Sequence, residues 1–409
     1  MNKTTVSEGW AMALELDRII NRAGSGCIKY DARKRMFGRD DVIPLGIADM
    51  DFPAPRAVTE ALEKRAQHGV YGYTLRRADY FEPMLDWQKK RNGWEIDPKL
   101  ITWSPGVIPS LSACIRLFTK RGDRILIQPP VYPHFASTIE ACSRKVSENR
   151  LKLVDGRWEI DFEDFEKKLE DAKLFVLCSP HNPVGRIWRR EELERMTELC
   201  AEKGVPVFSD EIHSDIILFG GRHIPAASVS EKAAANVITA FSATKTFNLA
   251  GVQGSAAVFP NAAMKKKFDR FWASLDLTLS NCFSAEAVPA AYREGEKWLE
   301  AVTGYVEENI LYIKRFFAEN APKIVPNVPE ATYLVWLDCR SLGLRDETLE
   351  KFFVNAGVGL NPGREFDAQL SGFMRLNAAC PRPLLEQALE GIAREYKKLC
   401  KRSTERQSQ

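Results

Sequence analysis

The sequence lacks a strong excess of charge of one sign. Its 58 lysine and arginine residues are nearly balanced by 55 aspartate and glutamate residues, which leaves a formal net charge of only +3. A protein that coats nucleic acid or another polyanion needs a clustered basic excess. The charge balance therefore argues against nucleic acid as a partner.

Long apolar runs and paired cysteines are missing as well. No uninterrupted apolar stretch of about 18 residues occurs, and the N-terminal stretch has no apolar run of signal-peptide length, so we expect no membrane partner. The nine cysteines include no Cys-x-x-Cys pair and are scattered through apolar segments. These features predict reduced cysteines and a cytoplasmic location. No spacing of histidine, cysteine and carboxylate residues resembles a metal site, so we expect no metal.

From about residue 100 onward, short β-branched runs alternate with amphipathic stretches. Strands are expected at residues 100–103, 124–128, 174–178, 205–209, 237–241 and 255–259, with helices between them, such as 110–120, 162–171 and 190–203. This alternation predicts an α/β fold whose mostly parallel sheet is covered by helices on both faces.

The pattern changes after about residue 290. Helices are expected at residues 298–319, 347–356 and 383–400, with strands at 333–338 and 373–377. This order predicts a smaller α+β domain at residues 290–409, a large domain at 49–289, and an N-terminal segment, 1–48, that joins the small domain.

Ligands of such sheets bind beyond the carboxyl ends of the strands, so the residues after each expected strand are candidates for a site. Gly106, Val107 and Ile108 open a helix, where free N–H groups can hold a phosphate, although this is also an ordinary helix start. Tyr132 follows the next strand and either covers a flat ring or simply packs. Asn182 lies between two prolines and either offers its amide to a ligand or serves only the turn.

Two charged residues follow later strands. Asp210 ends an apolar strand and is costly to bury without a cationic partner. Lys245 stands among apolar residues between the hydroxyls of Ser242, Thr244 and Thr246, where its amine could lose a proton and react with an aldehyde. The alternative is an ordinary salt-bridged or solvated lysine. Only the combination of these groups points to one ligand, because together they supply the contacts that pyridoxal phosphate requires.

With these residues in place, the sequence resembles the fold-type I pyridoxal-phosphate enzymes of the class I/II aminotransferase family. Within that family it is similar to the cystathionine β-lyase and cystalysin branch, the MalY/PatB group of carbon–sulfur lyases. The strings IPLGIADMDF at residues 43–52 and DEIH at 210–213 are specific to the branch, whereas the Asn-Pro pair at 182–183 and Ser-x-x-Lys at 242–245 are more general.

The resemblance implies a role for each candidate residue. Lys245 is implied as the catalytic lysine that binds the cofactor covalently, Asp210 as the partner of the pyridinium nitrogen, and Arg375 as the residue that binds the substrate carboxylate. Further contacts to cofactor or substrate are implied for Asn182, Tyr132, Ser242, Thr244, Gly106, Val107, Ile108, Ala48 and Tyr73. Tyr73 is expected to reach the cofactor phosphate of the neighbouring subunit, in a homodimer with shared active sites.

Some assignments stay open at this point. His213 stands where ordinary aminotransferases place a tyrosine near the ring hydroxyl of the cofactor. His181 is expected to form a wall of the site, and Asp49 and Asp51 either line its entrance or cap a turn. The resemblance implies β-elimination from cystathionine or a related cysteine S-conjugate, giving pyruvate, ammonia and a thiol. Transamination uses the same residues and remains the alternative, and a regulatory binding protein that keeps the fold is a third possibility.

Overall fold

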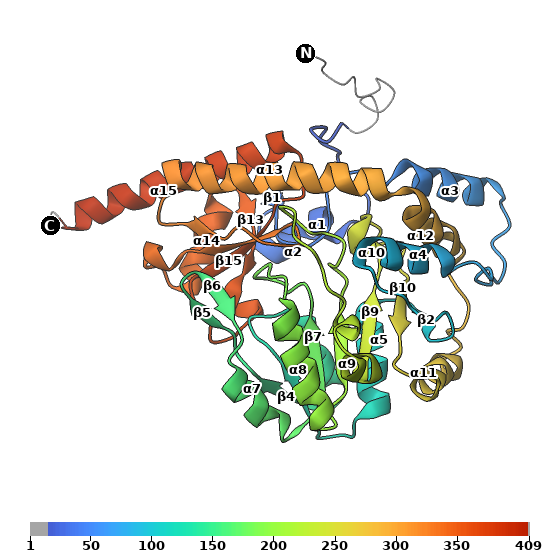
Figure 1. Ribbon diagram of the computed structural model, residues 1–409. Helices are drawn as coiled ribbons and strands as arrows, with labels where there is room; N and C mark the ends of the chain where they lie inside the picture. The colour runs from blue at the N-terminus through green and yellow to red at the C-terminus, as the bar shows by residue number, and fades with distance from the viewer. Residues whose placement is uncertain (1–14, 408–409) are drawn as a thin grey trace, which may run out of the picture.

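The computed structural model describes residues 15–407 and contains a large mixed sheet of seven strands (Figure 1). The strand order is β2-β10-β9-β8-β7-β3-β4, and within this sheet only β10 runs against the others. The strands are β2 (Ile101–Ser104), β3 (Arg124–Ile127), β4 (Lys145–Glu148), β7 (Ala172–Cys178), β8 (Val207–Asp210), β9 (Val237–Phe241) and β10 (Ser255–Val258). The predicted α/β class is confirmed. Edge strand β4 was not predicted, because its residues do not show a buried apolar pattern.

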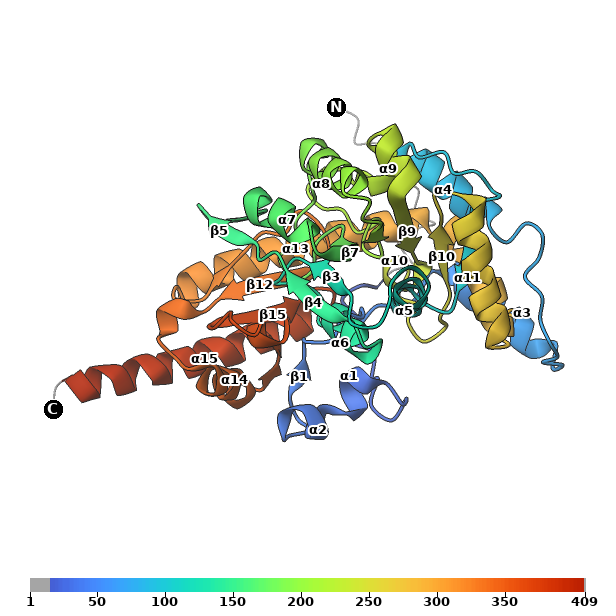
Figure 2. The same cartoon turned by 90° about the horizontal axis from the view of Figure 1, so that it is seen from below.

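Alternation along the strands explains why both faces of this sheet are covered. Ile125 and Ile127 belong to one apolar cluster, whereas Leu126 between them belongs to another on the opposite face. Figure 2 shows α8 and α9 on one side of the strands and α5 and α6 on the other. The first face packs against α5 (Val107–Phe118), α6 (His134–Ala141) and α11 (Ala262–Ser274), and the second against α7 (Phe162–Leu169), α8 (Arg190–Glu202) and α9 (Glu231–Asn236).

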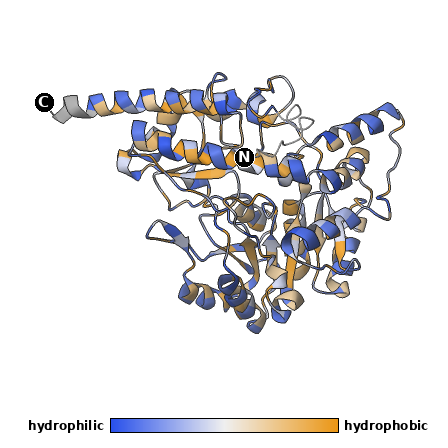
Figure 3. Ribbon diagram, turned by 45° about the horizontal axis from the view of Figure 1, so that its top comes forward, coloured by the Kyte–Doolittle hydropathy of each residue, from blue (hydrophilic) through white to orange (hydrophobic). Residues whose placement is uncertain are grey.

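A second, antiparallel sheet has four strands in the order β11-β12-β15-β14. They are β11 (Val325–Pro326), β12 (Leu334–Asp338), β14 (Asn361–Pro362) and β15 (Phe373–Asn377). The accompanying helices are α13 (Glu296–Asn320), α14 (Asp346–Asn355) and α15 (Arg382–Gln407), and Figure 3 shows apolar and polar residues alternating along the long ones. The two longer strands and the three helices lie where the sequence predicts them, except that α15 extends seven residues further, to Gln407.

The N-terminal part of the described chain connects to the C-terminal part through a short parallel pair. Strand β1 (Ile43–Pro44) pairs with β13 (Val358–Gly359), and β1 follows the short helices α1 (Ile28–Asp31) and α2 (Arg33–Phe37). The remaining elements are α3 (Arg56–Gln67), α4 (Glu82–Asn92), α10 (Ala243–Thr246), α12 (Cys282–Glu294) and the hairpin β5 (Lys152–Val154) to β6 (Arg157–Glu159). The domain boundaries at residues 48 and 289 stay a prediction, and residues 1–14 of the first segment lie outside the described residues.

A search of residues 15–407 finds no helix with both the length and the apolar character needed to cross a bilayer. The nine cysteines all lie within the described residues, and none of them forms a disulfide.

Candidate active site

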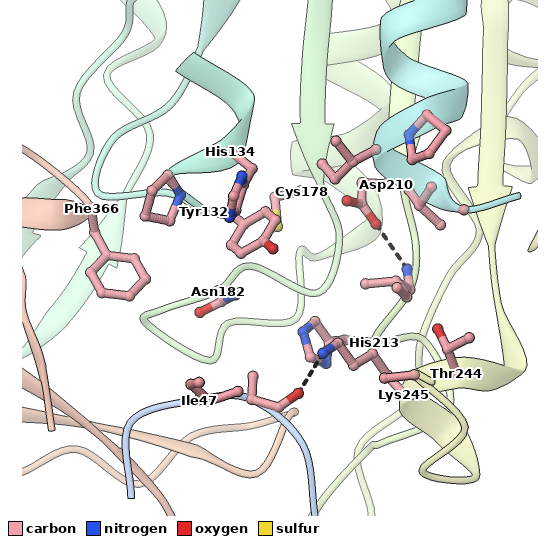
Figure 4. Close-up of a pocket in the computed structure, with 18 of the residues that line it drawn as sticks. Ile47, Tyr132, His134, Cys178, Asn182, Asp210, His213, Thr244, Lys245 and Phe366 are labelled. Atoms are coloured by element: carbon pink, nitrogen blue, oxygen red, sulfur yellow. Dashed lines mark hydrogen bonds between the residues drawn. The ribbon is translucent and has the colours of Figure 1, made fainter. Parts of the chain in front are cut away.

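A cavity of about 500 Å³ lies beyond the carboxyl ends of β7, β8 and β9 (Figure 4). All but two of the residues expected to contact cofactor or substrate line it. These are Ala48, Gly106, Val107, Ile108, Tyr132, Asn182, Asp210, His213, Thr244, Lys245 and Arg375. The two that do not line it are Ser242 and Tyr73.

One end of the cavity can hold an anion. Val107 and Ile108 begin α5, and the first N–H groups of a helix have no partner inside the helix. A side chain on Gly106 would place its Cβ only 3.2 Å from Cδ of Pro109, so glycine keeps the backbone open there. These N–H groups and the positive end of the helix dipole can bind a phosphate.

The hydroxyl of Thr244 also lines this end, but that of Ser242 does not. Ser242 Oγ donates a hydrogen bond of 2.7 Å to the carbonyl oxygen of Gly254. It also lies 2.8 Å from Thr244 Oγ1 and accepts a bond from the Thr244 N–H. Ser242 therefore holds Thr244 in place, and its own contact with a phosphate stays a prediction.

Lys245 lies on α10, the short helix directly after β9. Its Nζ donates a hydrogen bond to the carbonyl oxygen of Ala48. Burial lowers the pKa of Lys245 to about 8, although the nearby carboxylate of Asp49 opposes this effect. A buried amine with this pKa is neutral in about a tenth of the molecules at pH 7, far more than an ordinary lysine, so it can act as a nucleophile or a base.

Asp210 ends β8 and points into the same cavity (Figure 4). Its side chain accepts one hydrogen bond from a described residue, a bond of 3.1 Å from the N–H of Ile212. Burial raises the pKa of Asp210 to about 7. A cationic N–H group of a bound ligand would satisfy the carboxylate and favour its charged form.

Arg375 lies on β15 and brings a buried positive charge to the other end of the cavity. Its Nη2 donates to the carbonyl oxygen of Gly46 at 2.8 Å and to Oδ1 of Asn361 at 2.9 Å, and its Nη1 donates to Oδ1 of Asn182 at 3.1 Å. Within residues 15–407 it has no carboxylate partner, and burial lowers its pKa to about 10. A carboxylate of a ligand would supply the missing charge.

The flat part of a ligand has room between polar and aromatic groups. Tyr132 and His213 both line the cavity, and the buried Nδ1 of His213 has no hydrogen-bond partner in the described chain. Burial, together with Lys245 and Arg375, lowers the pKa of His213 to about 3, so this imidazole is neutral. A neutral imidazole can donate or accept a hydrogen bond.

Several residues near the site were misjudged or missed. His181 does not line the cavity, which corrects its expected place in the wall, because its Nε2–H donates to the carbonyl oxygen of Pro130. Tyr333 was expected only to begin a strand, yet its hydroxyl donates to the same Ala48 carbonyl at 2.9 Å. Asn361 and Glu365 line the cavity without any local sequence signal.

Asp49 and Asp51 do not line the cavity but form a charged cluster beside it. Asp51 pairs with Lys29 at 2.7 Å and with Arg22 at 2.6 Å, and Asp49 pairs with Arg22 at 2.9 Å. Asp49 and Asp51 therefore do not line the entrance as expected. Their ion pairs connect the chain around Ala48 to the N-terminal segment.

Tyr73 lies far from these groups in the loop between α3 and α4. Its side chain is almost fully exposed, at 98%. Within a single chain it therefore has no contact with the cavity.

The groups in the cavity fit pyridoxal phosphate. The start of α5 and Thr244 suit the phosphate, and Lys245 suits the aldehyde. The sparsely bonded carboxylate of Asp210 suits a protonated ring nitrogen, and Asn182 and His213 supply polar groups for a ring hydroxyl. The fit rests on these orphaned buried groups converging in one cavity.

Comparison with known proteins agrees with this geometry. The family model for aminotransferase class I and II matches residues 40–392, so the chain belongs to that family. It is 41% identical over 382 residues to cystathionine beta-lyase PatB of Bacillus subtilis, covering 93% of this chain and 99% of PatB.

Two solved structures have the same fold over nearly their whole length. A PLP-bound putative aminotransferase from Clostridium difficile superimposes with a TM-score of 0.92 at 41% identity, covering 93% of this chain and 99% of that chain. Cystalysin from Treponema denticola, which contains pyridoxal 5'-phosphate, superimposes with a TM-score of 0.90 at 33% identity, covering 95% and 100%. The resemblance to the carbon–sulfur lyase branch is confirmed.

Proposed function

We propose that this protein is a pyridoxal-phosphate-dependent carbon–sulfur lyase. It cleaves the Cβ–S bond of cystathionine or a related cysteine S-conjugate. The net reaction consumes one water and releases pyruvate, ammonia and a thiol. The observation that carries the proposal is the meeting of Lys245, Asp210, Asn182 and Arg375 in one cavity, in a chain 41% identical to a cystathionine beta-lyase.

Binding and orientation come first. The guanidinium of Arg375 takes the α-carboxylate of the substrate, with Asn182 and the backbone near Ala48 beside it. A planar guanidinium can make two parallel hydrogen bonds to a carboxylate, which fixes the direction of the Cα–H bond. Tyr132 covers the flat cofactor, and the N–H groups at the start of α5 hold its phosphate.

Proton transfer falls to Lys245. When bound, pyridoxal phosphate withdraws electrons from the Cα of an attached amino acid and so makes its Cα–H acidic. Because burial lowers the pKa of Lys245 to about 8, its neutral amine can take the proton from Cα. The carboxylate of Asp210 holds a proton on the ring nitrogen, and the electron pair left at Cα expels the thiolate from Cβ.

The direct test is the product analysis of the purified holoenzyme. Incubation with cystathionine or with S-alkylcysteines should release pyruvate and a thiol in equal amounts, without an added keto acid. Production of a new amino acid only when a keto acid is present, with no thiol released, would replace the lyase by a transaminase.

Transamination is the second candidate, and two findings favour it. The family is named for aminotransferases, and the Clostridium difficile structure at 41% identity is described as a putative aminotransferase. Lys245 would then return the proton to the cofactor instead of allowing the Cβ–S bond to break. The same assay with and without a keto acid separates the two reactions.

We further propose a homodimer in which each site is completed by Tyr73 of the other copy. An exposed apolar surface around this residue supports the proposal. Loop residues Val70, Tyr71 and Leu75 on one side, and Leu275, Leu277 and Leu279 on the other, are exposed. The two loops are joined by the bridge between Thr74 and Ser280, so their apolar side chains form one surface. A second copy would cover this surface by two-fold symmetry.

A cytoplasmic location is also proposed. The absence of disulfides among the nine cysteines, all of which lie in the described part of the chain, supports it, because disulfides are rare where thiols are kept reduced.

A further inference from the structure

One charged side chain of the cavity has no part in the proposed reaction. The acidic and basic residues that line the cavity are Lys245, Arg375, Asp210 and Glu365. The first three have the roles given above. We propose that Glu365 makes the site prefer cysteine S-conjugates whose sulfur substituent carries a positive charge, such as an ammonium group. The inference rests on the proposed function and names the class of its substrates.

Glu365 lies at the substrate end of the cavity. It ends the short turn Gly363–Glu365 that follows β14, and its Oε2 accepts a hydrogen bond of 3.0 Å from Nδ2 of Asn361. Oδ1 of the same Asn361 accepts a bond of 2.9 Å from Nη2 of Arg375. A single amide group therefore separates the Glu365 carboxylate from the guanidinium that we assign to the substrate carboxylate.

The neighbouring residue, Phe366, also lies at the substrate end of the cavity. The ring of Phe366 lies 4.7 Å from the Arg375 guanidinium carbon. Figure 4 shows Phe366 on the opposite side of the cavity from Thr244, which lies at the phosphate end. A substituent that extends from the substrate sulfur away from the cofactor is thus directed toward the part of the cavity that Glu365 lines.

The charge of Glu365 is available to a ligand. The side chain is exposed, and in the described part of the chain it forms no ion pair. The adjacent Arg364 is already paired with Glu347 at 3.5 Å and with Glu350 at 2.8 Å. An ammonium group at the mouth would be attracted to the free carboxylate, and a second carboxylate on the substrate would be repelled.

No other charged side chain of the cavity lining offsets this preference. Lys245 and Arg375 are the lysine and arginine side chains that line it, and the proposed reaction assigns both to the α-amino acid group of the substrate. Of the two histidines that line the cavity, the buried His213 is neutral, and the ring of His134 packs beside Tyr132 with 5.1 Å between the ring centroids. A carboxylate on the substituent therefore finds no free lysine or arginine there.

A binding experiment tests the charge preference without any turnover. The probes are L-lysine and L-norleucine, which differ by the terminal ammonium group and have no leaving group on Cβ. Their dissociation constants for the holoenzyme are measured by calorimetry, for the unmodified protein and for Glu365→Gln. The variant should lower the preference for lysine over norleucine by about three- to fivefold, as an exposed ion pair allows. Charge reversal in Glu365→Lys should lower it further.

Glu347→Gln is the matched control. It removes the same charge from the same region, but Glu347 does not line the cavity. This variant should leave the lysine-to-norleucine ratio unchanged. An equal fall of the ratio in Glu347→Gln and Glu365→Gln would show a general effect of net charge and would overturn the inference.

Kinetics then link the preference to the reaction. The ratio of kcat/KM for S-(2-aminoethyl)-L-cysteine to that for S-propyl-L-cysteine should fall about three- to fivefold in Glu365→Gln, and high salt should shrink the difference. If neither of these conjugates nor cystathionine gives pyruvate and thiol with the unmodified enzyme, the proposed function fails, while the binding ratio still decides the charge preference. If both ratios are unchanged in Glu365→Gln, the inference fails and the lyase assignment stands.

Discussion

Nη1 of Arg375 donates a hydrogen bond of 3.1 Å to Oδ1 of Asn182. Arg375 belongs to β15 of the four-stranded sheet, and Asn182 to the turn that follows β7 of the seven-stranded sheet. This one bond therefore joins the two sheets at the cavity. A ligand that contacts both side chains depends on how the sheets are positioned, because a shift of either sheet would change the geometry around Cα of the substrate.

Arg375→Lys should damage recognition of the α-carboxylate more than folding. Lysine keeps the positive charge but cannot form the two parallel bonds of a guanidinium. We expect KM for amino acid substrates to rise by about tenfold or more, with a smaller fall in kcat. Steady-state kinetics measure both, and primary amines without a carboxylate, bound to the holoenzyme as a control, should be little affected. An equal loss for both kinds of ligand would instead indicate a structural role for Arg375.

Asp210→Asn should keep the fold and lose most of the activity. The amide has the shape of the carboxylate but not its charge, so it does not stabilise a proton on the ring nitrogen of the cofactor. We expect kcat to fall by about 100-fold or more, the range found when a preorganised electrostatic contact is removed. Circular dichroism and cofactor titration serve as controls for folding and binding. Near-normal turnover would mean that Asp210 does not face the ring nitrogen.

The stability of the cofactor-free protein should depend on Asp210 in a definite direction with pH. The folded-state pKa of about 7 is raised above the ordinary value of 3.8, so folding favours the protonated acid. Asp210 therefore imposes no penalty below about pH 4, and its penalty grows as pH rises through 7, up to about 4 kcal/mol if the full shift is expressed. Asp210→Asn should remove this penalty, so the variant gains stability over the unmodified protein between about pH 4 and 7. Urea unfolding at several pH values measures the difference. A constant difference across this range would contradict the buried, unpaired state of Asp210.

The sequence predicts the core of the site because its residues follow a simple rule. Asp210 and Lys245 come directly after apolar strands, and the carboxyl ends of parallel strands meet at one edge of a sheet. The order of strands β9, β8 and β7 then brings them together with Asn182. The same rule could not place Arg375, which lies on the other sheet; only the family resemblance indicated its role.

Other features depend on contacts that no local pattern encodes. Asn361 reaches the cavity from β14 of the smaller sheet, and Glu365 from the turn that follows this strand. Asp49 and Asp51 pair with Arg22 and Lys29, which lie twenty or more residues away in the sequence. The hydroxyl of Ser242 donates a hydrogen bond to the carbonyl oxygen of Gly254, and only the packed structure reveals this contact. Long-range packing decides these positions, so periodicity and motif spacing miss them.

The shared-site homodimer can be tested by mixing two variants. Tyr73→Ala and Lys245→Ala should each have very low activity, since each lacks one part of every site. After subunit exchange, the mixed dimer contains one site with Lys245 from one chain and Tyr73 from the other. We expect activity to recover to about a quarter of the level of the unmodified enzyme, because half of the dimers are mixed and each has one intact site. Mass spectrometry verifies that the subunits have exchanged. If no activity is recovered after verified exchange, the shared site is refuted.

The central claim is that Lys245 binds pyridoxal phosphate covalently and drives the reaction. Its most direct test is borohydride reduction of the purified yellow holoenzyme, followed by peptide mapping by mass spectrometry. Reduction converts the link between cofactor and lysine into a stable secondary amine, and we expect the cofactor mass on the peptide that contains Lys245. Lys245→Ala should still bind the cofactor reversibly but should carry no such adduct and show almost no turnover. An adduct on a different lysine, or none on the unmodified enzyme, would contradict the assignment.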